Sequence, residues 1–386
     1  MFSLYIHYPF CLSKCPYCDF NSYAISHINK EEYLKAYCKE LEFYYNLLGK
    51  RKINTIFFGG GTPSLMSVNF LKSLFEKIND LWGIEEGIEI SMEANPTTVE
   101  INKFQEFKNI GINRLSIGIQ SLNDNELKFF GRIHSREEGI KAIKTAQKIF
   151  KDKYSIDLIY ARPNQNLNNW ISELEEAIKL SPFHISLYQL IIEEGTLFYK
   201  NKVKTLDDDN SIILYNKTNE ILEKNNLYLY EVSNYAKKGY ECKHNLNYWD
   251  SGEWIGIGAG AHSRVCISNN FIGDYKERAV IENIKLPKKW LESVLKNGYG
   301  YEIFEKLTKE EFIEEIILMG LRKKNGINLQ NVQKYLKIEN IEEILNKNNM
   351  AFLNNNNYIY LNKNNVKINL EYFNILDSII EKLLSY

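Results

Sequence analysis

The sequence has no excess of charge of either sign, because its 48 lysine and arginine residues balance 49 aspartate and glutamate residues. A balanced chain creates no long-range field that would attract a polyanion or an anionic membrane. The sequence also lacks an apolar run of about 20 residues, the length that spans a bilayer. We therefore expect no nucleic-acid partner and no transmembrane segment.

A secretory signal is absent as well, since the N-terminus has no basic segment followed by a small-residue cleavage site. We therefore expect a cytoplasmic protein, in which thiols stay reduced and clustered cysteines bind metal or react. The composition, 44% hydrophobic and 25% charged, is typical of a globular protein. At 386 residues the chain is long enough for a large domain and a smaller one.

Strand and helix patterns alternate through the first half of the chain. The strands are rich in Ile, Leu, Phe and Tyr, which is typical of parallel strands buried on both faces. Six such units fall short of the eight of a complete TIM barrel, so we predict an α/β fold with a partial (βα)6 barrel. Ligands of such folds bind beyond the carboxyl ends of the strands. The predicted strands are residues 3–8, 53–58, 88–94, 113–119, 154–160 and 184–192.

Three regions are predicted. Residues 1–205 form the partial barrel, residues 206–285 extend it, and residues 286–386 form a smaller C-terminal α+β domain. That last region combines helices with a hairpin expected at residues 350–362, an order that resembles a winged helix. No stripe of lysine and arginine accompanies it, so we expect a lid or docking platform rather than a DNA reader.

Three of the six cysteines, Cys11, Cys15 and Cys18, lie within eight positions after the first strand. Zinc prefers four ligands in paired knuckles, and the other cysteines are scattered. Three thiolates are the ligands that a 4Fe-4S cluster needs when one iron must stay open. A cluster is therefore favoured, and a zinc-stabilised interaction protein is the alternative. Of the scattered cysteines, we expect Cys38 to be a small core residue.

The spacing of these cysteines resembles that of the radical S-adenosylmethionine (SAM) superfamily. In that superfamily the amino and carboxylate groups of SAM chelate the open iron, and an electron from the cluster can cleave the sulfonium to a 5′-deoxyadenosyl radical. Gly59, Gly60 and Gly61 end the second strand, where bare backbone can approach a ligand closely. Glu93 can hold an ammonium group, and Asp157 suits a pair of ribose hydroxyls.

A closer resemblance rests on the segments "LYIHYPFCLSKCPYCDFNSY", "FFGGGTPS", "EANP", "RLSIGIQS", "GRIHS", "IDLIYARPNQ" and "HISLYQLIIEEGT". Together they are similar to the oxygen-independent coproporphyrinogen III oxidase-like family. The resemblance implies that the three cysteines hold the cluster and that Tyr5, Gly60 and Glu93 contact the SAM bound to it. It places a second SAM, or its surroundings, at Tyr17, Gly61, Thr62, Gln120, Arg132, Asp157 and Ile191.

Two departures separate the chain from the true oxidases. Those enzymes carry a fourth cysteine where this chain has Phe20, and an extension before the first strand, which here begins within three residues of Met1. The segment "HNLNYW" instead resembles the HNxxYW motif of the heme chaperone branch. That branch implies heme and heme-accepting proteins as partners, and transient membrane contact if an acceptor lies in a membrane.

The resemblance implies that heme contacts His244, Asn245, Tyr248 and Trp249. An imidazole can ligate iron and the aromatic rings offer flat faces, so we rank His244 first as iron ligand. Cys242 and His262 are further candidates, and a buried histidine beside core aromatics is the structural alternative. His7 is expected to pack behind the cluster. The predicted function is a heme chaperone, with an oxygen-independent coproporphyrinogen III oxidase as the alternative and catalysis left open.

Overall fold

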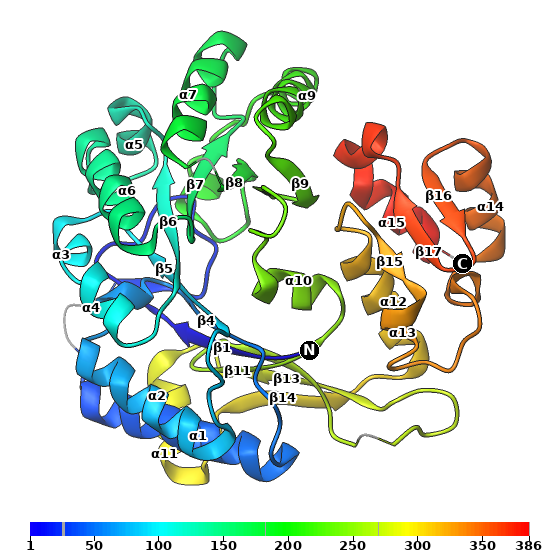
Figure 1. The fold of residues 1–386 in the computed structure, drawn as a ribbon, viewed down its shortest axis with the longest axis horizontal. Coiled ribbons are helices and arrows are strands. Elements are labelled where there is room, and N and C mark those ends of the chain that lie inside the picture. The colour runs from blue at the N-terminus through cyan, green and yellow to red at the C-terminus, as the bar shows by residue number, and fades with distance from the viewer. Residues whose placement is uncertain (25–27, 182, 269, 386) are drawn as a thin grey trace.

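A curved sheet of twelve strands, in the order β14-β13-β12-β11-β1-β4-β5-β6-β7-β8-β10-β9, organises the protein (Figure 1). The computed structural model describes residues 1–24, 28–181, 183–268 and 270–385. Six neighbouring strands in the middle of the sheet are parallel throughout, which confirms the predicted partial barrel. They are β1 (Phe2–Tyr8), β4 (Thr55–Gly60), β5 (Glu89–Ala94), β6 (Arg114–Gln120), β7 (Tyr154–Tyr160) and β8 (His184–Gln189).

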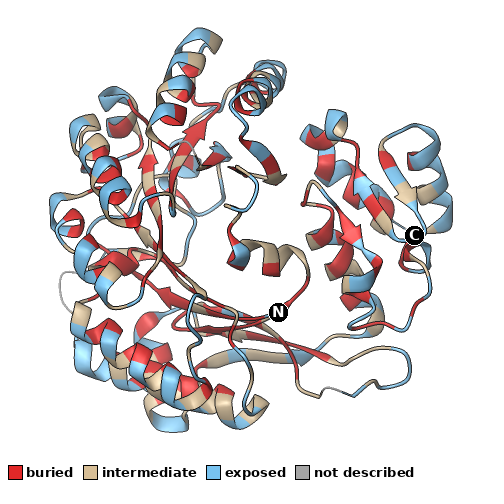
Figure 2. Ribbon diagram, in the orientation of Figure 1, coloured by how far each residue is buried: buried red, intermediate tan, exposed pale blue. Residues whose placement is uncertain are grey.

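Helices cover the convex side of this parallel sheet (Figure 1). Buried residues follow the strands and the helix faces turned toward them (Figure 2). This arrangement is the one expected when each parallel strand is joined to the next by a crossover. The segments between β1 and β8 are β2 (Phe10–Cys11), β3 (Tyr23–Ala24), α1 (Lys30–Leu48), η1 (Pro63–Leu65), α2 (Val68–Trp82), α3 (Thr98–Ile101), α4 (Phe104–Asn109), α5 (Asp124–Phe129), α6 (Arg136–Phe150) and α7 (Leu167–Leu180).

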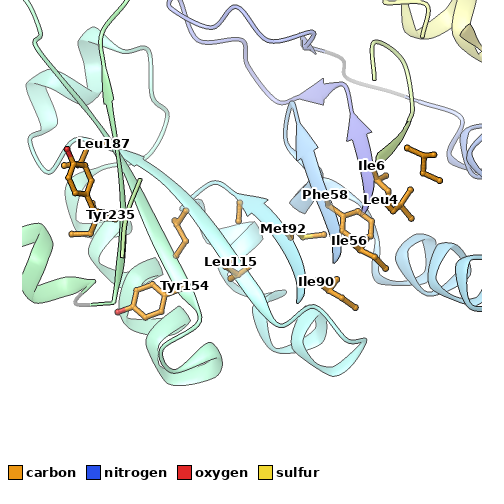
Figure 3. Packing of buried hydrophobic residues seen from close by; sticks show 14 of the residues in the cluster. Leu4, Ile6, Ile56, Phe58, Ile90, Met92, Leu115, Tyr154, Leu187 and Tyr235 are labelled. Carbon is orange, nitrogen blue, oxygen red and sulfur yellow. The ribbon is translucent and has the colours of Figure 1, made fainter. Parts of the chain in front are cut away.

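The two faces of the barrel strands differ in chemistry. Side chains alternate along a strand, so one set packs under the helices and the next points into the barrel. The helix-facing set is hydrophobic, and Figure 3 labels these of its members: Leu4, Ile6, Ile56, Phe58, Ile90, Met92, Leu115, Tyr154 and Leu187. The inward set lines a cavity and, apart from Phe57, is polar; it includes Tyr5, His7, Ser91, Glu93, Ser116, Asp157, Ser186 and Tyr188. The barrel interior therefore offers several polar groups to a ligand.

Antiparallel strands extend the sheet at both edges. β11 pairs in parallel with β1, and β12, β13 and β14 follow it as antiparallel neighbours. Because β14 pairs with β13, the boundary predicted at residue 286 divides two bonded strands, and we propose that the smaller domain begins after Lys306. The elements are α8 (Leu197–Lys200), α9 (Asp208–Lys224), β9 (Tyr228–Glu231), β10 (Asn234–Ala236), α10 (Lys243–Trp249), β11 (Glu253–Ile257), β12 (His262–Cys266), β13 (Arg278–Asn283), α11 (Pro287–Asn297) and β14 (Tyr301–Lys306).

The C-terminal domain has helices and its own three-stranded sheet, β15-β17-β16. The hairpin predicted at residues 350–362 is wrong, because residues 350–355 end a helix and the hairpin is formed by β16 and β17. Asn346 caps that helix by accepting bonds from the amides of Asn348 and Asn349. The elements are α12 (Lys309–Gly320), β15 (Ile327–Asn328), α13 (Leu329–Val332), η2 (Ile341–Ile344), α14 (Lys347–Asn355), β16 (Ile359–Asn362), β17 (Asn365–Ile368), η3 (Leu370–Ile375) and α15 (Leu376–Leu384).

No helix in the described part of the chain has both the length and the apolar character that crossing a membrane requires.

Arg278 joins the C-terminal domain to the sheet. Its side chain is 0% exposed, donates to the carbonyl oxygens of Ser251 (2.6 Å) and Gly252 (2.9 Å), and pairs with Glu315 of α12 (3.2 Å). The guanidinium also lies over the ring of Phe312. One buried cation therefore connects β13, the turn between α10 and β11, and a helix of the next domain.

We expect Arg278→Met to destabilise the protein by about 3 kcal/mol or more, because it breaks a buried ion pair and leaves two carbonyls unpaired. Denaturant unfolding measures the change. Lys306→Met, which removes an exposed ion pair with Glu277, is the control and should cost less than about 1 kcal/mol. Equal midpoints for the two variants would contradict the role given to Arg278.

Candidate functional site

The three clustered cysteines lie on one loop at the carboxyl end of β1. The loop closes on itself, because β2 pairs with β3 and the amide of Cys18 donates to the carbonyl of Cys15 at 3.2 Å. All three side chains line a single cavity of about 360 Å³. The loop therefore presents its thiols together at the end of the barrel where the sequence predicts ligands.

Each thiol has a hydrogen-bond partner in this cavity. Thr62 donates to the sulfur of Cys11 (3.4 Å) and Arg132 donates to that of Cys15 (3.5 Å). The Cys18 sulfur and the Ser22 hydroxyl are 3.6 Å apart. Burial raises the pKa of the Cys11 and Cys18 thiols, and the bonds from Thr62 and Ser22 oppose that rise. Such donors stabilise sulfur when it carries negative charge, as it does when bound to iron.

The thiol arrangement fits a cluster better than a single ion. Among the described residues, no three His, Cys, Asp or Glu side chains are close enough to hold one metal ion. A 4Fe-4S cluster binds its thiolates at separate irons, so its ligands stand farther apart. Gly61 keeps the space beside them open, since a Cβ there would lie 3.0 Å from the Cys11 sulfur and 2.8 Å from the Phe10 carbonyl oxygen. The residues present therefore suit a cluster with one iron lacking a protein ligand.

We expect Gly61→Ala to reduce cluster assembly, because the added methyl group displaces the Cys11 sulfur. Iron and sulfide content after anaerobic reconstitution measures the effect. Gly139→Ala on α6 is the matched control, since its Cβ would meet neighbours only at ordinary contact distances of 3.6 Å and beyond. Full cluster content in Gly61→Ala would show that the thiols tolerate the displacement.

Two half-buried carboxylates, those of Glu93 and Asp157, face the same cavity. The amide of Gly60 donates to Glu93 at 3.1 Å, and the hydroxyl of Ser116 donates to Asp157 at 2.9 Å. Burial raises the pKa of Glu93 to about 8, with the Asp157 charge adding to the rise. Burial raises the pKa of Asp157 to about 6. A cationic ligand would relieve the cost of ionising both groups, so this part of the cavity suits an ammonium or sulfonium group.

Arg132 connects the cysteine loop to the strand ends. One of its terminal nitrogens donates to Asn95 (2.5 Å) and to the carbonyl of Gly118 (2.8 Å). Its Nε is buried and has no hydrogen-bond partner within the described residues. Asn95 in turn donates to Thr62 at 3.1 Å. The sequence analysis did not single out Asn95, although its place directly after a strand, in "EANP", is the signal that could have identified it.

Most of the residues expected around SAM meet in this cavity. Tyr5 is an exception, because its side chain points into the barrel interior instead. The expected residues that line the cysteine cavity are Tyr17, Gly60, Gly61, Thr62, Glu93, Gln120, Arg132, Asp157 and Ile191. These residues come from several loops and strands. The fold therefore brings together, in one cavity, residues that are far apart in the sequence.

The "HNLNYW" segment forms α10 and lies at the opposite, amino end of the barrel strands. Glu89, the first residue of β5, accepts hydrogen bonds from the amides of Lys243 (3.2 Å) and His244 (3.1 Å). Thr55, the first residue of β4, bonds the His244 ring at 2.8 Å. Cys242 is buried beside Glu89, with its sulfur 3.5 Å from the carboxylate. The helix therefore closes the end of the barrel away from the cysteines.

A second cavity, of about 490 Å³, lies between this helix and the mouth. His244, Asn245 and Tyr248 line it, and Trp249 does not, because one step along a helix turns a side chain by about 100°. Trp254 of β11, which the sequence analysis did not select, lines it instead. This inner cavity adjoins the cysteine cavity, since Glu93, Ser116, Asp157 and Tyr188 line both.

The ring of His244 is fully engaged by the protein. Its Nδ1 is 2.8 Å from the Thr55 hydroxyl and its Nε2 is 2.8 Å from the Tyr248 hydroxyl. Burial lowers the pKa of His244 to about 3, so the ring is neutral. His244 is therefore a buried, neutral ring held by two hydroxyls in this structure, and its rank as first iron ligand stays a prediction.

The structure also places the other residues that the sequence analysis considered, His7, Cys38 and His262. His7 is buried, bonded to the Tyr5 hydroxyl (3.0 Å) and the Asn21 carbonyl (2.9 Å), as a packing role requires. Cys38 lies on α1 and packs against the core. His262, the first residue of β12, lines the inner cavity and also a third cavity beside the cysteine loop.

Comparisons with known proteins agree with this geometry. The family model of the radical SAM superfamily matches residues 5–177. The heme chaperone HemW of Buchnera aphidicola subsp. Schizaphis graminum is 37% identical over 91% of this chain and 93% of its own length. HemW of Escherichia coli K12 is 41% identical over 68% of this chain and 70% of its own length.

A vertebrate relative and one solved structure extend the comparison. The mitochondrial radical S-adenosyl methionine domain-containing protein 1 of Danio rerio is 33% identical over 90% of this chain and 78% of its own length. Coproporphyrinogen III oxidase (HemN) of Escherichia coli has a TM-score of 0.82 at 20% identity, covering 100% of this chain and 90% of its own, a likeness that shows the fold. The three-cysteine loop, the partial barrel and the relatives that match nearly end to end lead to one conclusion: the chain belongs to the HemW heme chaperone family of the radical SAM superfamily.

Proposed function

We propose that this protein is a cytoplasmic heme chaperone, which binds heme and passes it to acceptor proteins. The observation that carries the proposal is a relative named heme chaperone that is 37% identical over 93% of its length. An inner cavity of about 490 Å³ is within the size range of sites that bind organic ligands, which supports it.

The cofactors of this proposal are those of the radical SAM superfamily. Cys11, Cys15 and Cys18 would hold a 4Fe-4S cluster, which supplies an electron to SAM. Gly60 and Glu93 would receive the amino-acid part of SAM through backbone and carboxylate. The other residues that line the cysteine cavity would surround its remainder or a second SAM.

Phe20 favours a chaperone over a porphyrinogen decarboxylase. It stands where the oxidases carry a fourth cysteine, and its ring is 56% exposed at the rim of the cysteine cavity. The fold shared with HemN carries no activity by itself. We therefore expect this chain not to decarboxylate coproporphyrinogen.

We propose that the C-terminal domain acts as a lid or as a docking platform for the acceptor. Met319 of α12 lines the inner cavity. Lys323 forms an ion pair with Asp250, the residue directly after α10, and Asn331 donates to the same carboxylate at 3.0 Å. A movement of this domain would therefore change access to the inner cavity.

Heme transfer tests the proposal. The reconstituted protein is loaded with hemin under anaerobic conditions and mixed with a heme-free b-type hemoprotein, whose own spectrum reports transfer. Transfer faster than dissociation of heme into buffer is the expected result. A parallel incubation with coproporphyrinogen III, SAM and a reductant should yield no protoporphyrinogen. Absence of specific heme binding, or clear decarboxylation, would overturn the proposal.

A further inference from the structure

We propose that Arg114, together with Ser91 and His184, binds a carboxylate group of the ligand that enters the inner cavity. The inference rests on the proposed function, which makes that ligand heme and that carboxylate one of its two propionates. All three residues line the inner cavity and lie in the amino-terminal halves of β5, β6 and β8, at the end of the barrel that α10 closes. The sequence analysis did not single them out.

Arg114 is a buried cation without an ion-pair partner among the described residues. It is 7% exposed, and one terminal nitrogen donates to the carbonyl of Tyr240 at 3.1 Å. The other terminal nitrogen is buried and has no hydrogen-bond partner within the described residues. Arg162 and Arg278, which are also buried, each pair with a glutamate. Because a guanidinium stays charged, its burial is costly unless an anion lies beside it.

The carboxylates whose charges act on Arg114, those of Glu89 and Asp157, have other partners. Glu89 accepts hydrogen bonds from two amides at the start of α10, and Asp157 accepts one from Ser116. A carboxylate brought in by a ligand would therefore give Arg114 the close partner that the described residues do not provide.

Ser91 and His184 add two further unpaired groups to the same cavity. Ser91 is opposite Arg114 in the register of β5 and β6, so their side chains share the inward face. Its hydroxyl is buried and lacks a hydrogen-bond partner within the described residues, as does Nδ1 of His184.

The His184 ring can supply one hydrogen-bond donor. Its Nε2 is 2.9 Å from the Tyr230 hydroxyl. Burial lowers the pKa of His184 and the Arg114 charge lowers it further, so the ring is neutral and carries one N–H. Buried polar groups are nearly always hydrogen-bonded, and three unpaired ones in one cavity indicate a ligand group that accepts from them.

The rest of the inner cavity suits the apolar part of such a ligand. Phe57 of β4, Tyr248 of α10, Trp254 of β11 and Met319 of α12 also line it. Heme is an apolar disc with two carboxylates on one edge. The assignment therefore adds a carboxylate contact to the heme site that the resemblance implies at α10.

Esterification of the propionates tests the contact in the wild-type protein. We expect the reconstituted protein to bind hemin roughly tenfold or more tightly than hemin dimethyl ester, which lacks both negative charges. Iron-free protoporphyrin IX should show the same preference over its own dimethyl ester, because this contact does not involve the iron. Titrations followed by absorption and by quenching of protein fluorescence measure the affinities.

Substitution of Arg114 should remove this preference. We expect Arg114→Gln to weaken hemin binding by roughly tenfold or more and to bind the dimethyl ester as wild type does, since the two changes delete the same interaction. Arg114→Lys should recover part of the loss. Arg136→Gln on α6 removes a guanidinium outside the cavity and is the control, which should bind hemin as wild type does.

Ser91→Ala is a milder variant, because it removes a hydroxyl that has no hydrogen-bond partner within the described residues. We expect its unfolding midpoint to equal that of wild type and its hemin affinity to fall by roughly threefold, with no change for the dimethyl ester. Circular dichroism verifies that every variant folds.

A free small anion is the other source of a carboxylate. Equal affinity of wild type for hemin and its dimethyl ester, with stabilisation by sodium propionate alone, would assign the site to such an anion and overturn the inference. Loss of ester binding in Arg114→Gln would overturn it as well, since it would show a structural role. Wild-type protein that binds neither porphyrin would instead overturn the proposed function.

Discussion

Cys15→Ser is expected to hold no 4Fe-4S cluster after anaerobic reconstitution, with iron and sulfide near zero and the cluster absorption lost. Three thiols line the cavity, and no cluster of three or more other metal-binding side chains in the described chain could replace the missing one. The Arg132 guanidinium also loses its sulfur acceptor and is left partly unpaired in a buried place. Iron and sulfide analysis with absorption spectroscopy measures the result.

Cys38→Ser is the control for this experiment. Cys38 packs on α1 against the core and does not line the cysteine cavity, so its variant should assemble a full cluster. A cluster retained by Cys15→Ser, or lost from Cys38→Ser, would show that the loop is not the cluster site.

Glu93→Gln is expected to weaken SAM binding and to stabilise the protein without ligand. Loss of a charge-assisted hydrogen bond to the SAM ammonium should reduce affinity by roughly tenfold to a hundredfold. The opposite effect on stability follows from the raised pKa. The pKa of the Glu93 carboxyl is 4.5 in the unfolded chain and about 8 in the folded protein. The protonated carboxyl therefore favours the folded state at low pH. That contribution is lost as pH rises from 4.5 to about 8.

The stability gain should therefore be present at pH 8, where we expect roughly 2 to 4 kcal/mol, and nearly absent at pH 4.5. Thermal unfolding at several pH values, with isothermal titration of SAM, measures both effects. Glu137→Gln, which changes an exposed carboxylate on α6, should alter neither. Unchanged SAM affinity in Glu93→Gln would show that this carboxylate does not contact SAM. A stability difference between variant and wild type that does not change with pH would contradict the raised pKa of Glu93.

Local pattern was enough to predict the barrel and much of its mouth. Alternating strand and helix signals placed all six parallel strands, and residues directly after strand ends, such as Glu93, had to meet because parallel strands share one end. The predicted hairpin failed for a local reason, since Asn346 caps a helix through an asparagine-rich stretch that reads as a turn. Strand β14 was not predicted, because helix α11 separates it in the sequence from β13, the strand with which it pairs.

The surroundings of the histidines could not be predicted from the sequence. Both ring nitrogens of His244 contact hydroxyl groups, those of Thr55 and Tyr248, and Thr55 is nearly two hundred residues away in the sequence. His262 likewise lies opposite Glu282 only through the register of β12 and β13. The burial and the hydrogen-bond partners of an imidazole both arise from contacts between distant segments, which a local sequence pattern does not contain.

With only three cysteine ligands, one iron of the cluster stays open toward the SAM cavity. Mössbauer spectroscopy of protein reconstituted with isotope-enriched iron, recorded with and without SAM, tests it most directly. We predict that SAM changes the signal of one iron and leaves the others as they were. A spectrum that SAM does not change, from a cluster with protein ligands on every iron, would contradict the account.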